Sequence, residues 1–535
     1  MITHKKSLGR LGVGIVGLVL LTAGSILTLQ GCTDLDEDTF GAITPDNFYN
    51  TEAEFVAALA PVYAQLRSAG FGGYWAASEI TTDEAMIPTR GTDWDDGGVH
   101  RAFHQHKWDA THGDLNGAWN DAFTGVARAN TVLDNLANST TALSSKDAFE
   151  AELRTIRAFF YYQLMDLFGG VPIVTAPAVD PKNPPARGSR QEVFEFIETE
   201  LTEAMPNLID VARGSDYGRV AKGAAQALLA NMYLNAEVFT GTVTTGGLSR
   251  GTARWQDALN MADAVINSGH YELAQNYFDN FSVGNMQAAG NKYENIFSAT
   301  YKAKGGLGLT HSMRMLHYTQ LPQSPWNGYT TLAEVWRSYS DEDSRKKMFL
   351  VGVQREGPNA NCVGQDCFSQ GETLKDRSGN DLTFTEEAPL VGATEGDGIR
   401  VLKFELDPAQ TGGDSGNDYP VFRLGEMWLI RAEALNELGR TPEAVLAVNV
   451  IRNRSNVADL NAADFNQASL RDQILTERLH ELIYEAKRRQ DQIRFGTFTS
   501  RAWHEKQPSE AFRVLMPVPQ PQINANSALQ QNPGY

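Results

Sequence analysis

Apolar residues recur at helical spacing along much of the chain, with polar residues between them. In the segment 44–67, the apolar positions that share one helical face are Phe55, Leu59, Val62 and Leu66. A period of about 3.6 residues predicts an amphipathic helix. The same pattern recurs in the segments 114–136, 146–170 and 189–208. Ser189, with Glu192 three residues later, has the spacing of a capping box and predicts a helix start.

Two further regions have the pattern of paired antiparallel helices. Residues 219–239 precede 254–273, and residues 422–440 precede 441–455. Ala and Gly stand where two helices must approach closely, and larger apolar residues fill the positions between them. This arrangement resembles the tetratricopeptide pattern and predicts a scaffold of helix pairs. Three tryptophans on apolar helical faces are expected in the core: Trp119, Trp255 and Trp428.

The stretch 271–419 has a different character, because Gly, Asn, Asp and Pro are dense and helical periodicity is lost. The run GDGIRVLKFELD within it is typical of a short strand. We therefore predict a mainly α body at 45–535, with helix pairs at 45–270 and 420–535 and a loop-rich insertion with few short strands between them. Loops on a rigid scaffold often carry binding sites, so the insertion is a candidate ligand-binding region.

The start of the chain has the pattern of an export signal. It includes Lys5, Lys6 and Arg10 and no acid, and residues 11–29 carry no charge. A basic start followed by an apolar run is typical of a signal peptide. An uncharged run of this length is also long enough to span a bilayer as a helix.

Cys32 favours the signal-peptide interpretation. Leu29 precedes it by three residues and Gly31 directly, which resembles the lipobox of bacterial lipoproteins. We therefore predict a signal peptide at 1–31, lipidation of Cys32 and an acidic tether at 32–44. Several acyl chains hold a protein stably on a membrane. The alternative is a simple N-terminal membrane anchor in which Cys32 is incidental.

The composition is acidic, with a formal net charge of −19. This balance argues against nucleic acid as a partner. Beyond Cys32, the cysteines of the sequence are Cys362 and Cys367. A disulfide between them is plausible in an oxidising compartment. Half of a metal site is the less favoured alternative, because no second cysteine pair exists to complete it.

Several motifs then occur in a recognisable order. They are the lipobox at Cys32, the helix with FGGVP at 154–174, the segments 419–439 and 449–454, the segment 474–496, and LMPVPQPQINANSALQQNPGY at 515–535. Together they resemble the SusD/RagB family of nutrient-uptake outer-membrane lipoproteins. One departure is Ala486-Lys487, where the family usually has Glu-Gly before an Arg. This departure concerns a helix end.

The resemblance implies a SusD-like fold and a position on the outer face of the outer membrane. It implies a nutrient ligand, usually an oligosaccharide or polysaccharide and sometimes a peptide. The expected partner is a SusC-like TonB-dependent transporter, to which the ligand is passed. The family implies neither an enzyme activity nor a cofactor.

Exposed aromatic rings and nearby polar groups are what a sugar-binding site requires, because sugar rings have apolar faces and a rim of hydroxyls. Aromatic residues among polar neighbours fall in two segments, 70–120 and 321–336. The candidate platforms are Trp94, Trp326, Trp75, Tyr329 and Trp108, with Arg90, Asp93 and Asn327 as polar partners. The alternative for each ring is a place in the core.

Other functions are less favoured by the sequence. Four histidines raise the question of a metal site, namely His100, His104, His106 and His112, but no tight carboxylate or cysteine spacing completes one. A glycoside hydrolase would need two carboxylates across a cleft, which sequence spacing cannot identify. A further alternative hypothesis is a helical-repeat scaffold that binds only proteins.

Overall fold

The computed structural model describes residues 48–284, 293–358 and 360–535. Residues 49–535 form one compact unit. The predicted signal peptide, the tether and Cys32 lie outside the described residues. About 46% of the described residues are helical and the strands are short, which confirms the predicted mainly α fold.

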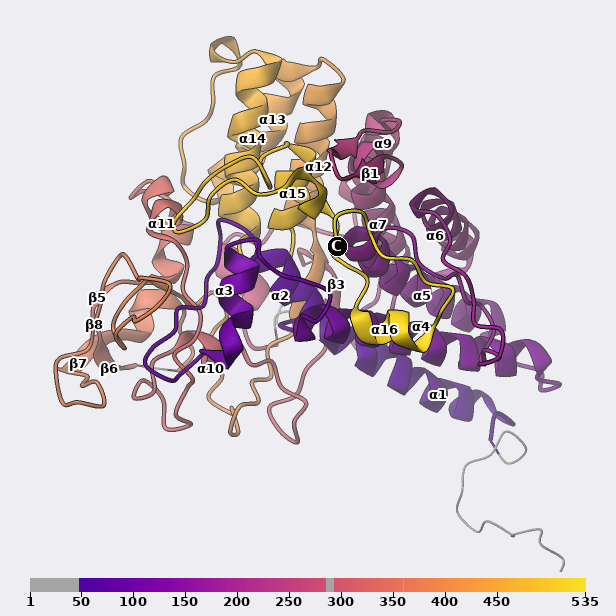
Figure 1. Cartoon of the computed structure of the whole chain (residues 1–535), viewed down its shortest axis with the longest axis horizontal. Coiled ribbons are helices and arrows are strands. Elements are labelled where there is room, and N and C mark those ends of the chain that lie inside the picture. Colours follow the sequence, from indigo (N-terminus) through magenta and orange to yellow (C-terminus); the bar gives the residue numbers. More distant parts are fainter. Residues whose placement is uncertain (1–47, 285–292, 359) are drawn as a thin grey trace, which may run out of the picture. The chain divides into compact units, whose positions relative to one another are not determined.

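The scaffold before the insertion consists of helices that pack along one another (Figure 1). They are α1 (Glu52–Gln65), α2 (Gly73–Glu79), α3 (Val99–His104), α4 (Gly113–Asn138), α5 (Lys146–Phe168), α6 (Arg190–Ala204), α7 (Lys222–Leu234), α8 (Ala236–Phe239) and α9 (Trp255–Ile266). Helix α4 packs on α5, α5 on α6, and α7 on α9. The predicted capping box of Ser189 and Glu192 begins α6. Gly125 allows α4 to approach α5, since a Cβ atom there would lie 2.2 Å from the Phe160 ring.

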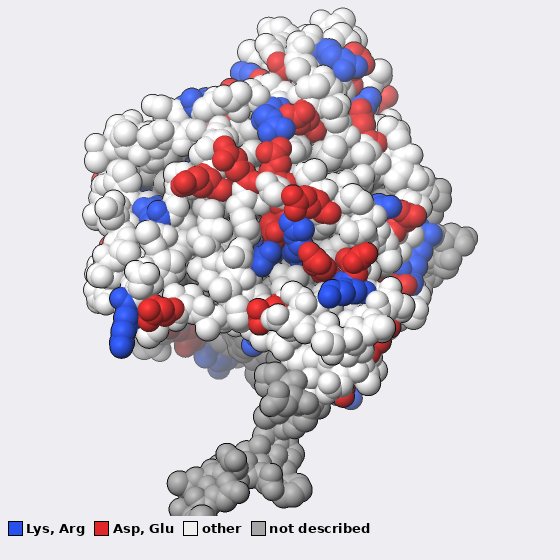
Figure 2. Space-filling model, turned by 90° about the vertical axis from the view of Figure 1, so that its right-hand side faces the viewer, with Lys and Arg blue, Asp and Glu red and all other residues white. Residues whose placement is uncertain are grey.

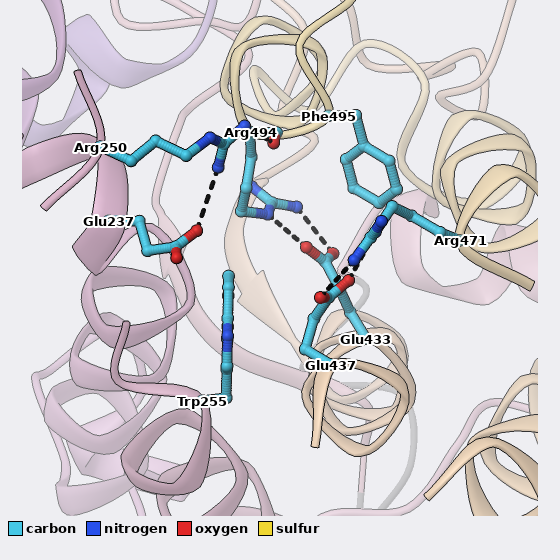
Figure 3. A pocket seen from close by; sticks show the side chains of 8 residues that line it. All are labelled: Glu237, Arg250, Trp255, Glu433, Glu437, Arg471, Arg494 and Phe495. Carbon is cyan, nitrogen blue, oxygen red and sulfur yellow. Dashed lines mark hydrogen bonds and ion pairs between the residues drawn. The ribbon is translucent and has the colours of Figure 1, made fainter. Parts of the chain in front are cut away.

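The helices after the insertion complete the same scaffold. They are α12 (Leu424–Glu437), α13 (Thr441–Arg454), α14 (Gln467–Leu482), α15 (Arg488–Arg494) and α16 (Gln520–Ala525). Helix α12 packs against α13, α14 and also α9, which precedes the insertion. Two helix pairs that are distant in sequence are therefore adjacent in space. Residues of α8, α9, α12, α14 and α15 line a cavity of 330 Å³ (Figure 3).

The insertion is held by short antiparallel strand pairs. These are β3 (Asn295–Ala299) with β10 (Tyr419–Arg423), β4 (Phe349–Leu350) with β9 (Arg400–Val401), β5 (Gly352–Val353) with β8 (Thr383–Phe384), and β6 (Arg355–Pro358) with β7 (Phe368–Thr373). The hairpin of β1 (Thr242–Thr244) and β2 (Gly247–Ser249) belongs to the scaffold. The insertion also contains α10 (His311–Met315) and α11 (Ala333–Ser338). The strand predicted in 396–407 is β9.

Single turns of 3-10 helix connect many of these elements. They are η1 (Leu66–Ala69), η2 (Asp96–Gly98), η3 (Met205–Asn207), η4 (Gly214–Asp216), η5 (Tyr277–Phe281), η6 (Ser344–Met348), η7 (Gly364–Cys367), η8 (Ala462–Asp464) and η9 (Ala511–Val514). Near η7, Cys362 and Cys367 form a disulfide with Cα atoms 5.3 Å apart. Cys367 is buried in an apolar cluster of the insertion with Leu350, Phe368 and Leu402.

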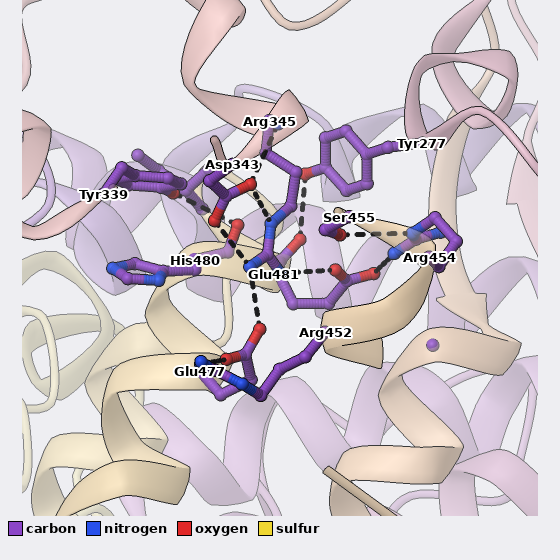
Figure 4. A network of polar contacts seen from close by, with 12 residues as sticks. Tyr277, Tyr339, Asp343, Arg345, Arg452, Arg454, Ser455, Glu477, His480 and Glu481 are labelled. Atoms are coloured by element: carbon purple, nitrogen blue, oxygen red, sulfur yellow. Dashed lines mark hydrogen bonds and ion pairs between the residues drawn. The ribbon is translucent and has the colours of Figure 1, made fainter. Parts of the chain in front are cut away.

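A buried network of ion pairs ties the insertion to the scaffold (Figure 4). Arg345, in the insertion, donates to Glu477 at 2.8 Å and to Glu481 at 2.9 Å, both on α14. Arg454 at the end of α13 also contacts Glu481. All four side chains are at most 4% exposed. Burying charges is costly unless every partner is present, so this network demands one relative placement of insertion and helices.

Charged residues of both signs are interspersed on the surface drawn in Figure 2. Acidic and basic side chains lie beside one another in clusters there. This differs from the continuous basic face of nucleic-acid-binding proteins. Among the described residues, no helix is both long and apolar enough to cross a bilayer.

Candidate ligand-binding surface

The two aromatic segments that the sequence offered as candidates meet in the structure. The indole Nε1–H of Trp94 donates to the backbone carbonyl of Trp326 at 2.7 Å. Trp94 is half-buried, whereas Trp326 is 38% exposed. The ring of Trp326 contacts the guanidinium of Arg314, whose Cζ lies 5.8 Å from the ring centroid. Trp326 therefore presents a free aromatic face, and Trp94 supports the turn that carries it.

The backbone at Trp94 and at the residue directly after Trp326 lies in the left-handed region. Trp94 has φ = 62° and Asn327 has φ = 51°. A bulky residue such as Trp94 rarely adopts this region, whereas asparagine adopts it more readily. Between these segments, Gly328 leaves room for the Trp94 ring, since a Cβ atom there would lie 2.4 Å from Trp94 Cζ2. Such strain persists only where surrounding contacts fix it, and it is commonly found at ligand sites.

A buried aromatic layer lies beneath these two tryptophans. Tyr329 contacts the Trp94 ring edge-on, with centroids 5.6 Å apart, and the Trp75 ring at the same distance. Trp75 is fully buried, and its Nε1–H donates to the carbonyl of Tyr484 at 3.2 Å. Tyr329 is 2% exposed and its hydroxyl accepts from Arg314 at 2.8 Å. The structure thus corrects the prediction for Trp75 and Tyr329: they are core residues that support the surface.

The prediction for Arg90 is also corrected. This residue is not a ligand contact, and its side chain instead acts as a clamp that holds loops together. Its side chain is buried and donates to four backbone carbonyls, those of Pro88, Gly328, Thr394 and Asp397, at 2.7 to 3.3 Å. Burial lowers the pKa of its guanidinium to about 10. These bonds join the segment before Trp94, the turn after Trp326 and the 394–397 loop.

Asn327 has a similar supporting role. It is fully buried; its Oδ1 accepts from Arg400 Nη2 at 2.7 Å and its Nδ2 donates to the Glu395 carbonyl at 3.0 Å. No polar atom of this side chain is free for a ligand. The amide instead fixes the left-handed turn directly after Trp326. Asn327 is therefore corrected from a ligand contact to a positioning residue.

Asp93 lies at a polar rim beside Trp94. Its carboxylate accepts from the Tyr318 hydroxyl at 2.5 Å and from Arg377 Nη2 at 2.9 Å. The hydrogen bond from Tyr318, with that from Arg377, holds the pKa of Asp93 below its ordinary value. The guanidinium of Arg377 stacks on the Tyr318 ring at 3.8 Å and also contacts Glu395.

Tyr318, Arg314, Arg377 and Glu395 were not identified from the sequence. Tyr318 and Arg314 lie in HSMRMLHYTQLPQSPW, close to Trp326, and an aromatic residue so near a candidate platform was an available signal. Arg377 and Glu395 are distant from both tryptophans in sequence, and no local sequence pattern pointed to them. We call the set of Trp94, Trp326, Arg314, Tyr318, Asp93 and Arg377 the aromatic surface.

Trp108 does not belong to the aromatic surface. It is 2% exposed, and its Nε1–H donates to the hydroxyl of Tyr535 at 2.8 Å. His106 packs against it, with ring centroids 4.9 Å apart. The prediction that Trp108 is a platform is therefore corrected, because this residue anchors the C-terminal segment.

The histidines close to Trp108 bind protein groups. His106 lies between the Thr81 carbonyl at 2.7 Å and Ser509 Oγ at 2.8 Å, and His112 stacks on Phe103. His104 Nε2 contacts the His504 carbonyl at 2.6 Å. Burial lowers the pKa of His104 to about 4, which keeps its imidazole neutral. In the described part of the chain, no group of three or more His, Cys, Asp or Glu is placed to hold a metal ion.

A mainly α body of helix pairs with few short strands fits a SusD-like fold. Two family models match the chain, the SusD family over residues 273–513 and "starch-binding associating with outer membrane" over 42–234. The chain belongs to the SusD/RagB family.

Curated relatives extend over most of the chain. A SusD-like protein of Formosa agariphila is 26% identical over 95% of this chain and 98% of its own length. The starch-binding protein SusD of Bacteroides thetaiotaomicron is 25% identical over 77% of this chain and 76% of its own.

Solved structures share the fold. A SusD-like protein from Bacteroides fragilis superposes with a TM-score of 0.71 and 21% identity, and covers 92% of this chain and 98% of its own. A laminarin-binding SusD-like protein has a TM-score of 0.68 and 21% identity, with coverage of 91% and 100%.

Proposed function

We propose that this protein binds a glycan at the aromatic surface. The observation that carries this proposal is the pair of Trp94 and Trp326, which come from distant segments and are joined by the Nε1–carbonyl hydrogen bond. An exposed indole flanked by guanidinium, carboxylate and phenol groups matches the apolar face and hydroxyl rim of a sugar ring. Relatives named for binding starch and laminarin support this ligand class.

The protein acts as a binding protein and not as an enzyme. Its described ionisable groups at the aromatic surface are engaged with one another, as in the contacts of Asp93 with Tyr318 and Arg377. A glycosidase would need one carboxylic acid and one carboxylate on opposite sides of a sugar bond. The relatives named above are likewise described by what they bind.

The family and Cys32 support a proposed cellular role. The protein is lipid-anchored at Cys32 on the outer face of the outer membrane, and it delivers its glycan to a SusC-like TonB-dependent transporter. Support comes from the lipobox and from the family description that includes outer-membrane association. Co-purification of the native protein with such a transporter from outer membranes tests this role. Its recovery from the soluble fraction without a transporter would contradict it.

Binding is tested with starch, laminarin and other polysaccharides by affinity electrophoresis and calorimetry. At least one polysaccharide should retard the protein, and Trp326→Ala should abolish most of this retardation. Trp428→Phe, in the helical scaffold, is the matched control and should bind like the wild type. Equal retardation of Trp326→Ala and wild type would exclude the aromatic surface as the site. Absence of binding to every polysaccharide would favour a scaffold that contacts only proteins.

A further inference from the structure

Trp255 lies in the wall of a cavity that shares no residue with the aromatic surface. Trp255 is the first residue of α9, and sequence periodicity places it in the core. The structure instead leaves it half-buried in the wall of the 330 Å³ cavity. Among the described residues, its ring makes no aromatic or cation–π contact and its Nε1–H has no hydrogen-bond partner. The fold therefore does not use the polar atom of this indole.

The cavity around Trp255 is lined by paired charges (Figure 3). Glu237 pairs with Arg250 at 3.1 Å, and Glu437 pairs with Arg471 through two hydrogen bonds of 2.5 and 2.7 Å. Figure 3 shows the indole of Trp255 between the Glu237 and Glu437 side chains. A third pair, Glu433 with Arg494, is nearly fully buried. Three carboxylates thus face three guanidinium groups, and the lining has no excess charge.

The arginines of the two exposed ion pairs keep N–H groups that are available to a ligand. The side chains of Arg250 and Arg471 are 40% and 41% exposed. Arg250 uses Nη1 and Nη2 for protein acceptors, and Arg471 uses Nε and Nη2. Among the described residues, Arg250 Nε and Arg471 Nη1 have no acceptor. Because both guanidinium groups are held by carboxylates, these N–H groups point in fixed directions.

These features select one class of ligand. A lining of balanced charge gives little attraction to a net anion or cation, but it offers donors and acceptors together. A flat indole requires an apolar face on the ligand. Neutral sugars combine such a face with hydroxyls that both donate and accept. The volume is at the lower end of the roughly 300–1,000 Å³ of small-molecule pockets, which suits a short saccharide.

We propose that the cavity around Trp255 is a second binding site, specific for a short neutral saccharide. Trp255 supplies the platform, and the Arg250–Glu237 and Arg471–Glu437 pairs supply the hydroxyl contacts. The site lies on the helix pairs and shares no residue with the aromatic surface. This proposal can therefore be tested independently of the function proposed above.

The test uses the full chain labelled with 5-fluorotryptophan, whose nine tryptophans give ¹⁹F signals. The Trp255→Phe variant identifies the signal of Trp255. Maltose and laminaribiose are added at millimolar concentration, with glucuronic acid and glucosamine as charged comparators. We expect the Trp255 signal to shift with at least one disaccharide and to shift less with the charged sugars. No shift of this signal with either disaccharide overturns the proposal, whatever the Trp326 signal does.

Two variants separate this site from the aromatic surface. The double variant Trp94→Ala/Trp326→Ala should retain the Trp255 shift; its loss would show an indirect effect and overturn the proposal. Arg471→Gln should weaken the saccharide affinity measured at Trp255 about tenfold, as expected for loss of one anchoring group. Arg440→Gln, which removes an exposed arginine paired with Glu443 on the neighbouring helix, is the matched control and should leave that affinity unchanged. Equal weakening by both variants would contradict the proposed contacts.

Discussion

The indole N–H of Trp94 donates to the backbone carbonyl of Trp326 at 2.7 Å, across 232 positions of sequence. This bond gives the two tryptophans different tasks. Trp94 is held over Gly328 and fixes the turn, whereas Trp326 keeps an exposed ring. Substitutions at the two positions should therefore have distinguishable effects.

Trp326→Ala should weaken glycan binding about tenfold or more with little change in melting temperature, because an exposed ring adds affinity but little stability. Trp94→Phe should lower both affinity and melting temperature, because it removes the bond to the Trp326 carbonyl. Calorimetric titration and thermal unfolding of both variants measure this. Equal affinity losses without any loss of stability in Trp94→Phe would exclude a positioning role for Trp94.

Gly328→Ala should also weaken glycan binding. The added methyl group would lie 2.4 Å from the Trp94 ring, so the ring or the turn must move. Gly117→Ala is the matched control, because its Cβ would meet nothing within 4 Å and Gly117 lies inside α4. The control should bind normally and gain up to about 1 kcal/mol of stability. Normal binding by Gly328→Ala would show that the turn tolerates the shift.

The buried ion-pair network should be sensitive to loss of a single partner. Glu481→Gln leaves Arg345 and Arg454 without their shared carboxylate, and we expect a loss of about 3–5 kcal/mol in the free energy of unfolding. Chemical denaturation measures the loss. Glu443→Gln, in an exposed pair with Arg440, is the control and should cost far less, because exposed ion pairs contribute little to stability. Similar losses in both variants would contradict the assigned role of the network.

Glu79 and Glu84 form a buried carboxyl pair at the end of α2, and each is at most 1% exposed. Burial raises the pKa of Glu79 to about 7 and, with repulsion from Glu79, raises that of Glu84. The folded chain therefore retains protons that the unfolded chain releases near its ordinary carboxyl pKa of 4.5. The contribution of this pair to stability should be fully present below that pH and should be lost as the pH rises through about 7.

The double variant Glu79→Gln/Glu84→Gln should remove this part of the pH dependence, because neither glutamine side chain titrates. Denaturant unfolding at pH 5, 7 and 8 measures it. Glu443→Gln should keep the wild-type slope. An unchanged slope in the double variant would show that other groups cause the dependence.

Cys32 should carry the lipid anchor. Metabolic labelling with a palmitate analogue should mark the wild type, and Cys32→Ala should not be labelled. The variant should also leave the membrane fraction. Cys362→Ala is the control for non-specific thiol labelling, because its partner in the structure is Cys367. Labelling that persists in Cys32→Ala would rule out this anchor.

The helical scaffold could be predicted because its signals are local. Apolar spacing and the Ser189 cap lie within single helices, and they gave the helix pairs correctly. The strand pairs of the insertion could not be predicted, because β4, β5, β8 and β9 have two residues each and pair across long loops. Sequence periodicity has no information about such distant partners.

The candidate site was predicted in part for a similar reason. Aromatic residues among polar neighbours pointed to Trp94 and Trp326, whose role as ligand contacts remains a prediction. The same pattern also selected Trp75 and Trp108, which are buried by segments far away in sequence. Trp255 shows the reverse case, since its apolar helical face meets a cavity.

The clamp formed by Arg90 has a consequence for which substitutions the joined loops tolerate. Its guanidinium recognises only backbone carbonyls, which every amino acid supplies. Side chains in the joined loops can therefore be exchanged during evolution without dismantling the frame that holds them. Substitutions at the loop tips can thus reshape the surface that these loops present, while the contacts of one arginine keep the loops in place.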